Sequence, residues 1–505
     1  ISGKCIIYIK SIMSFRPIFG KPRLTQDWGE EQHERETHWT SLFYDLLIVA
    51  ALNAIAEPFE EVEGGGGDGD GGDGESTGED TIPHLGPINR LWLNALLQFA
   101  AVITPWNSLN EYTAMFEDES FVGHLAFFVH CFGLASTTAG CVGELEENWR
   151  TLAVGIILSK FGLLVLYIRP LMYIPRARAH SLMRSSTFLI VIVLMAWTLT
   201  FDGSEAFEHF RNVLIGTCIF SWLGLIGIVF LGDQRVPLHI QSYADRQKEV
   251  TMVIFGEAIF AVTLQPRSNA TSHSHFYLSL ALTLWLIYSL ALQEYHIMPS
   301  VEDHALRRSL FFGFSWYYTQ FVKQVFLMGV SIGIKRVHLL TFVAPEEPID
   351  HATRQLVVWG MSLTLFGVVL IRSWSMGYGR HPSKYDPPPL YWLQVGWWIC
   401  LGLSCFMPQL IGNTLMRAFP QPLSCLGFLG LMMFLIILFE AWASNFAAEL
   451  IKKLTVQDGE INDELTYLRS TSAESFHDVR KFLHVHGPKG PKNNNQESNP
   501  NGQTH

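Results

Sequence analysis

The stretch HWTSLFYDLLIVAALNAIA, residues 38–56, decides the fold class of this chain. It is apolar almost throughout, and as a helix it nearly spans the ~30 Å hydrocarbon core of a bilayer. Apolar runs of similar length recur along the whole chain, whereas a membrane β-barrel would show segments of about ten residues with alternating polarity. The sequence therefore predicts an all-α, polytopic membrane protein.

The overall composition agrees with a membrane protein. Of the 505 residues, 49% are hydrophobic and only 16% are charged, whereas soluble domains usually carry about 25% charged residues. The net charge of −11 lies mostly in loops and tail and argues against nucleic acid as a partner. The lipid bilayer is the predicted partner, and an oligomer remains open.

Twelve apolar runs are predicted to cross the membrane as helices. They lie at 39–56, 88–106, 121–142, 149–169, 184–201, 211–232, 249–265, 276–296, 310–333, 354–374, 391–412 and 422–444. Lys and Arg gather near the membrane on the side of the N-terminal segment, which predicts that both termini are cytosolic. This orientation places Asn269, in the sequon Asn269-Ala270-Thr271, on the opposite side as a predicted glycosylation site. Either the plasma membrane or an endomembrane fits.

The two halves of the chain carry similar segments in the same order. The matched segments are FYDLLIVAAL (43–52) with FGEAIFAVTL (255–264), LNEY (109–112) with LQEY (292–295), and LSKFGLLVL (158–166) with LTLFGVVLI (363–371). Six spans per repeat is an even number, so two parallel six-helix repeats are predicted, related by an axis along the membrane normal.

The repeat also sets the predicted domain organisation. Its parts are a cytosolic N-terminal segment 1–38, a first repeat 39–232 with a flexible acidic, glycine-rich loop at 57–87, a second repeat 233–447, and a cytosolic tail 448–505 that is disordered from about 487.

Two intramembrane carboxylates, Asp45 and Glu257, occupy equivalent positions in the repeats and are the main functional candidates. A charge in the bilayer core costs at least ~2.5 kcal/mol, so an accidental charge is not expected twice. Pseudosymmetry predicts that both approach a common central region and bind a transported cation or proton. Lys160 and Lys323 are the candidate internal counter-charges. The alternative is a static ion pair that only orders helices.

Other polar positions carry weaker expectations. Glu111 and Glu294 end the second and eighth predicted helices, where either a gate or plain interfacial solvation fits. His130 is predicted to be a core histidine with satisfied hydrogen bonds. His273 and His275 have too few neighbouring ligands for a metal site, and neither a metal nor a cofactor is predicted.

The segments around the two carboxylates, ERETHWTSLFYDLLIVAAL and HIQSYADRQKEVTMVIFGEAIFAVT, resemble the signatures of the bacterial low-temperature-requirement A family. The positions that fit are Arg35, Trp39, Leu42, Phe43, Asp45, Leu46, Val49, Ala50, His239, Arg246, Gly256 and Glu257. Ser41 and Tyr44 replace the usual Glu and Phe. The resemblance covers roughly residues 34–445 and implies no particular biochemical activity.

The motif arginines, Arg35 and Arg246, each precede the carboxylate of their own helix by roughly 15 Å. This separation is too large for an ion pair within one helix. The two arginines, together with Trp39, Phe43 and Gly256, are therefore interpreted as motif anchors, with the arginines at the cytosolic interface.

No hydrolase, zinc-protease, Walker A or dinucleotide-binding motif occurs in the chain. The favoured function is transport or conduction of an ion or small solute through buried carboxylates. A non-transporting membrane sensor or scaffold is the alternative, and an intramembrane enzyme is the third. Transport predicts a water-accessible cavity at the carboxylates, whereas a scaffold predicts closed ion pairs.

Overall fold

The structure is a computed structural model of the chain. It describes residues 20–25, 39–56, 87–203, 205–229, 236–263, 273–295, 304–308, 310–343, 351–376 and 421–439, with a few isolated positions between them. The described residues lie in one compact unit that ends at Ala441.

The first half of the described chain consists mainly of long helices. They are α2 (Trp39–Ala56), α4 (Pro87–Met115), α5 (Phe121–Ala139), α6 (Leu145–Tyr173), α7 (Arg178–Thr198) and α8 (Ala206–Val229), with the short 3-10 turn η1 (Pro175–Ala177) before α7.

The second half also consists mainly of long helices. It contains α9 (Ile240–Thr263), α10 (His273–Tyr295), α11 (Ala305–Arg308), α12 (Leu310–Val343), α13 (His351–Met376) and a further helix at Pro422–Phe439. Every predicted run except 391–412 coincides with one of the long helices, and 391–412 lies outside the described residues apart from isolated positions.

Six of the described helices are long and apolar enough to cross a membrane. They are Phe121–Ala139, Leu145–Tyr173, Pro175–Thr198, His275–Tyr295, Thr353–Arg372 and Pro422–Phe439. The prediction of an all-α membrane protein is confirmed at this level, while the count of twelve spans is not. The helices α4, α9 and α12 fall outside this set because they carry many polar side chains, several of them in the interior.

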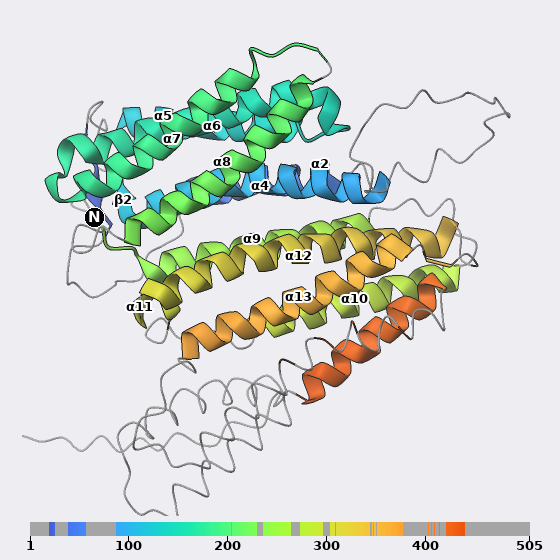
Figure 1. Ribbon diagram of the computed structural model, residues 1–505. Helices are drawn as coiled ribbons and strands as arrows, with labels where there is room; N and C mark the ends of the chain where they lie inside the picture. The colour runs from blue at the N-terminus through green and yellow to red at the C-terminus, as the bar shows by residue number, and fades with distance from the viewer. Residues whose placement is uncertain are drawn as a thin grey trace, which may run out of the picture. The chain divides into compact units, whose positions relative to one another are not determined.

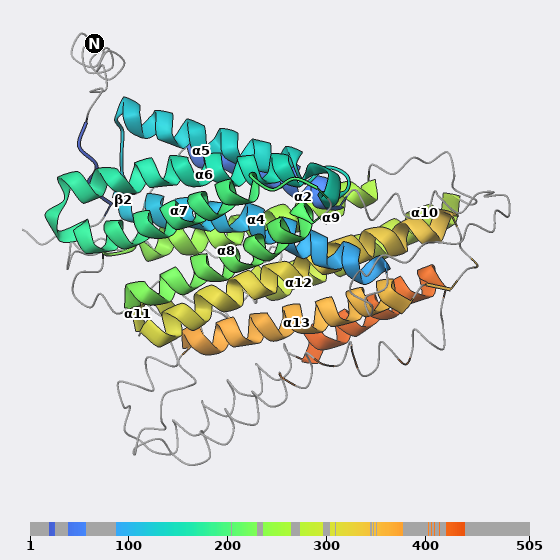
Figure 2. The same cartoon turned by 45° about the horizontal axis from the view of Figure 1, so that its top comes forward.

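The helices α2 and α4 lie between α5–α7 and the helices of the second half (Figure 1), while α8 contacts α12 directly. One side of α2 contacts α5 and another contacts α9, while α4 contacts α6, α8 and α9. The turned view shows α4 between α6 and α12 (Figure 2). This central place gives polar residues of α2 and α4 access to both halves.

Glycines bring α5 close to α6, and α12 close to α13. A Cβ atom at Gly155 would lie 2.3 Å from the backbone N of Thr137, and one at Gly360 would lie 2.8 Å from Cγ2 of Val330. Such contacts leave no room for a larger side chain, so the helices meet through their backbones.

The same close contacts recur in both helix pairs. The corresponding contacts are Gly140–Leu152 and Gly333–Val357, Thr137–Gly155 and Val330–Gly360, and His130–Gly162 and Lys323–Gly367. In every case the α12 residue follows its α5 counterpart by 193 positions, and the α13 residue follows its α6 counterpart by 205 positions.

The C-terminal end of α4 is held by two distant parts of the chain. Strand β1 (Arg23–Leu24) pairs antiparallel with β2 (Phe116–Glu117), and the Thr25 backbone N–H donates to the carbonyl of Met115 at 3.0 Å. From the α8–α9 connection, the backbone N–H of His239 donates to the carbonyl of Ala114 at 3.0 Å. Carbonyls that a helix end leaves without partners are thereby satisfied.

Candidate functional site

The carboxylate of Asp45 forms a two-point ion pair with Arg246 of α9. Arg246 donates from Nη1 to Oδ2 at 2.7 Å and from Nη2 to Oδ1 at 2.9 Å. The indole N–H of Trp106, on α4, donates to the same carboxylate at 3.3 Å. The side chains of Asp45 and Arg246 are only 13% and 7% exposed. The charge in α2 is thus compensated across the two halves.

Arg246 is itself surrounded by acceptors. Its Nε donates to Oδ1 of Asn110 at 3.3 Å, and its Nη1 also contacts the carboxylate of Glu249, one turn along α9. Arg246 was interpreted from the sequence as an anchor at the cytosolic interface, whereas in the structure it is 6% exposed and pairs with Asp45 of α2.

A chain of three amides runs beside this ion pair and links three helices. Gln324 on α12 donates from Nε2 to Oε1 of Gln247 on α9 at 3.1 Å, and Gln247 donates from Nε2 to Oδ1 of Asn107 on α4 at 2.7 Å. All three side chains are at least 96% buried. We call these residues the amide chain.

Glu257 lies elsewhere along α9. Ser331 of α12 donates to its carboxylate, and Nζ of Lys335 lies 3.9 Å from its Oε1. Eleven residues of helix separate Glu257 from Arg246, or about 16 Å. The prediction that Asp45 and Glu257 meet in one central region is not met, because Asp45 pairs near one level of α9 and Glu257 faces α12 at another.

The two predicted gate residues are buried in ion pairs. Glu111 contacts Arg184 of α7, with His180 Nε2 3.8 Å away, and Glu294 of α10 contacts Lys323 of α12. Their side chains are 13% and 5% exposed, so interfacial solvation does not describe them. Lys323 has the carboxylate partner expected of it, although on α10 rather than at Asp45 or Glu257.

Lys160 does not fill the counter-charge role. It is 2% exposed on α6, and its Nζ has no hydrogen-bond partner among the described residues. Its Nζ lies 5.3 Å from the centroid of the Phe188 ring. Asp45 is occupied by Arg246, so the expected pairing with Lys160 is absent.

The remaining residues named in the sequence analysis are not part of these polar contacts or lie outside the described residues. Phe43 is 48% exposed on α2, and a Cβ atom at Gly256 would meet no described atom within 4 Å. Arg35 and Asn269 lie outside the described residues, and Trp39 is placed only as the first residue of α2.

Tyr44 was missed by the sequence reasoning. Its hydroxyl lies 2.6 Å from Nε2 of His130, and Nδ1 of His130 lies 2.9 Å from the carbonyl oxygen of Ser159. A carbonyl only accepts, so Nδ1 carries the proton and the phenol donates to Nε2. The prediction of a satisfied core histidine is confirmed. Neighbouring residues of α2 thus hold α5 through Tyr44 and α9 through Asp45.

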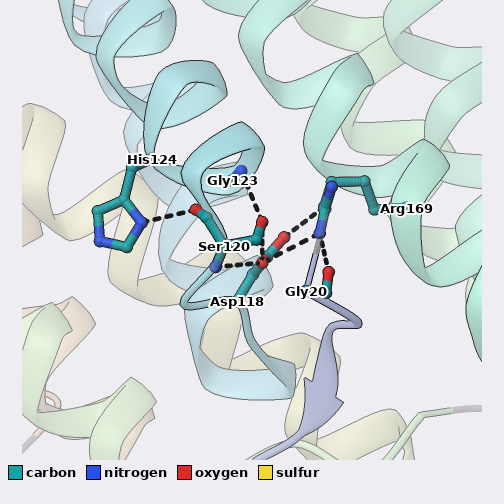
Figure 3. Close-up of polar contacts among 6 residues, drawn as sticks. All are labelled: Gly20, Asp118, Ser120, Gly123, His124 and Arg169. Atoms are coloured by element: carbon teal, nitrogen blue, oxygen red, sulfur yellow. Dashed lines mark hydrogen bonds and ion pairs between the residues drawn. The ribbon is translucent and has the colours of Figure 1, made fainter. Parts of the chain in front are cut away.

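A second missed cluster lies where the N-terminal segment meets the helix ends (Figure 3). Nε of Arg169 donates to Oδ2 of Asp118 at 2.5 Å, and the guanidinium also contacts the carbonyl of Gly20. Asp118 accepts from the Ser120 hydroxyl at 2.7 Å, and Ser120 caps α5 by accepting from the N–H of Gly123 at 3.0 Å. The cluster joins the segment around Gly20 to α5 and α6.

The geometry contains no metal site within the described residues, since they hold no group of three His, Cys, Asp or Glu side chains suited to a metal ion. Segments of four helices meet at the ion pair and the amide chain, namely α2, the polar end of α4, the start of α9, and α12. Two of these helices, α2 and α9, carry the sequence segments that resemble the family signatures.

The family model for bacterial low temperature requirement A protein (LtrA) matches residues 37–456. The chain belongs to the LtrA family. Neither the comparison with curated proteins nor that with solved structures gives a match. In this LtrA-family protein, family membership and the apolar helices together establish an integral membrane protein.

Proposed function

We propose that this LtrA-family protein transports an ion or small polar solute between its two six-helix repeats. The observation that carries the proposal is the polar interface between the halves, where α2, α4, α9 and α12 bury an ion pair and the amide chain. Buried polar groups are costly in a membrane protein and usually mark a transport path. A helical bundle held only by packing would not need them.

The recurrent glycine contacts support the repeat that this proposal requires. They keep constant offsets of 193 and 205 positions, which a chance resemblance between two helix pairs would not produce. Transporters built from two parallel repeats bind their substrate at the interface and work by rocking one repeat against the other. In the orientation that the sequence favours, both termini are cytosolic.

In this proposal the carboxylates do not bind the transported ion. They form ion pairs that hold helices together in one conformation. Asp45, Glu111 and Glu294 are each closed by a basic side chain in the structure. The pair of Asp45 with Arg246 holds α2 of one repeat against α9 of the other, so it must loosen when the interface opens. The structure then corresponds to a closed conformation.

The non-transporting scaffold is the second candidate, and the same closed pairs favour it. Purified protein in liposomes distinguishes the two. We expect flux of protons, potassium or a small solute above that of protein-free liposomes. We also expect the flux through the Asp45→Asn variant to differ at least tenfold from that through the unchanged protein. A folded protein without any flux would support the scaffold.

A further inference from the structure

The buried amides between the halves include polar atoms that the surrounding side chains leave without partners. Oε1 of Gln324 and Oε1 of Gln320, one turn apart on α12, have no hydrogen-bond donor among the described residues, and Nδ2 of Asn110 on α4 has no acceptor there. The three residues are 0%, 3% and 2% exposed. Buried polar groups are normally satisfied, so these atoms point to a ligand.

These three residues lie close to the amide chain, where α4 and α12 are linked through α9. Gln324 belongs to the amide chain, which reaches α4 at Asn107, and Asn110 lies one turn from Asn107. Residues three or four apart on a helix share a face, so Gln320 lies beside Gln324 and Asn110 lies beside Asn107. The region offers two acceptor oxygens from α12 and one donor from α4.

The charges next to this region are already paired. Arg246 is bound by Asp45, and Lys323, between the two glutamines in sequence, is bound by Glu294. A permanent ion would therefore find amide dipoles but no full opposite charge to compensate its lost hydration. A neutral molecule with both donors and acceptors matches the available atoms.

We infer that the region bounded by Asn110, Gln320 and Gln324 binds a small neutral solute that carries N–H or O–H donors together with one acceptor, such as a urea-like or small polyol molecule. Its donors would meet the two glutamine oxygens, and its acceptor would meet Nδ2 of Asn110. The inference rests on the proposed transport function and narrows its substrate class.

The first test measures permeation. Proteoliposomes are mixed with hyperosmotic urea or glycerol in a stopped-flow instrument, and light scattering reports solute entry. We expect faster entry of at least one of the two than in protein-free liposomes. Gln320→Leu should slow it about fivefold, the effect of losing one hydrogen bond to the solute. Gln324→Leu should slow it at least as much, because it also removes the hydrogen bond to Gln247. Val322→Leu is the matched control, because Val322 is 44% exposed on the same helix.

Permeation can also separate this inference from the proposed function. Entry of neither probe, or unchanged entry in both leucine variants, overturns the inference. Potassium or proton flux in the same proteoliposomes would show that the transport proposal survives that failure.

The second test does not depend on transport. Gln324→Cys is treated with a small, neutral methanethiosulfonate reagent, and mass spectrometry of the peptide containing position 324 reports modification. We expect labelling there, because a solute-binding region must admit water. Leu327→Cys is the control, since Leu327 is 2% exposed on the same helix within the hydrophobic core. If both positions stay unmodified in folded protein, the region is closed and the inference fails.

Discussion

Asp45 and Arg246 are 201 positions apart in the chain and form a two-point ion pair between α2 and α9. The carboxylate that is out of place in an apolar helix is therefore explained by a partner in the other half. Because the pair is almost completely buried, its two charges must be considered together. Removing Arg246 leaves the carboxylate of Asp45 without compensation, whereas removing Asp45 leaves Arg246 with Glu249 as its carboxylate partner.

The first prediction concerns this ion pair. Arg246→Gln should lower the free energy of unfolding by about 3–5 kcal/mol, because it leaves the buried carboxylate of Asp45 without its cation. Asp45→Asn should cost less, because Glu249 still pairs with Arg246. The double variant should be more stable than the sum of the single effects predicts. Thermal unfolding in detergent measures all three, and additive losses would show that the pair is not coupled.

Lys160 should behave in the opposite way. Lys160→Leu removes a buried amine that has no hydrogen-bond partner among the described residues, and leucine already stands at the aligned position 365. We expect unchanged or higher stability, by up to about 1–3 kcal/mol. Lys323→Leu is the comparison, because it strands the buried Glu294 and should destabilise. Strong destabilisation by Lys160→Leu would indicate a partner for this amine.

Tyr44→Phe tests the hydrogen bond that joins α2 to α5. The change keeps the ring but removes the hydroxyl that donates to Nε2 of His130, a residue with no exposed surface. An unsatisfied buried acceptor costs about 1–3 kcal/mol. Phe43→Leu, on the exposed side of the same helix, should leave the unfolding temperature nearly unchanged. Equal effects of the two changes would contradict the assigned role of the hydroxyl.

Glycine-to-alanine changes test the close helix contacts. Gly155→Ala would place its Cβ 2.3 Å from the backbone N of Thr137, so α5 and α6 must move apart, at a cost of about 1–3 kcal/mol. Gly216→Ala on α8 meets no described atom within 4 Å and should stabilise by up to about 1 kcal/mol through helix propensity. Gly360→Ala should resemble Gly155→Ala if the repeats are equivalent.

Two aspartates with arginine partners separate buried from exposed ion pairs. Asp118→Asn affects a pair whose side chains are 3% and 5% exposed, and should lower stability by about 3–5 kcal/mol. Asp202→Asn affects a pair whose side chains are 85% and 56% exposed and should change the unfolding temperature within experimental error. Similar results for both variants would argue against the assigned packing around Asp118.

The helices were predictable because length and apolarity are local properties of the sequence. Their ends were less so. The predicted run 88–106 stops nine residues before α4 ends at Met115, and the run 310–333 stops ten residues before α12 ends at Val343. In both helices the polar residues beyond the run include buried ones, so the end of hydropathy is not the end of the helix.

The candidate site was only half predictable. The cost of Asp45 in an apolar helix indicates that it has a partner, but the identity of that partner depends on which helices pack together. The sequence interpretation looked for an ion-pair partner of Arg246 only on its own helix. It assigned Lys160 as the counter-charge of a buried carboxylate. Neither reading could include the packing of α2 on α9, which sequence periodicity does not specify.

The end of α4 also has a consequence for the order in which the protein is built. Its last carbonyls accept from Thr25, which is synthesised before the helix, and from His239, which is synthesised more than a hundred residues after it. A nascent chain that has completed α8 therefore holds only one of these two contacts. We therefore expect α4 to reach its final position only after His239, directly before α9, has left the ribosome.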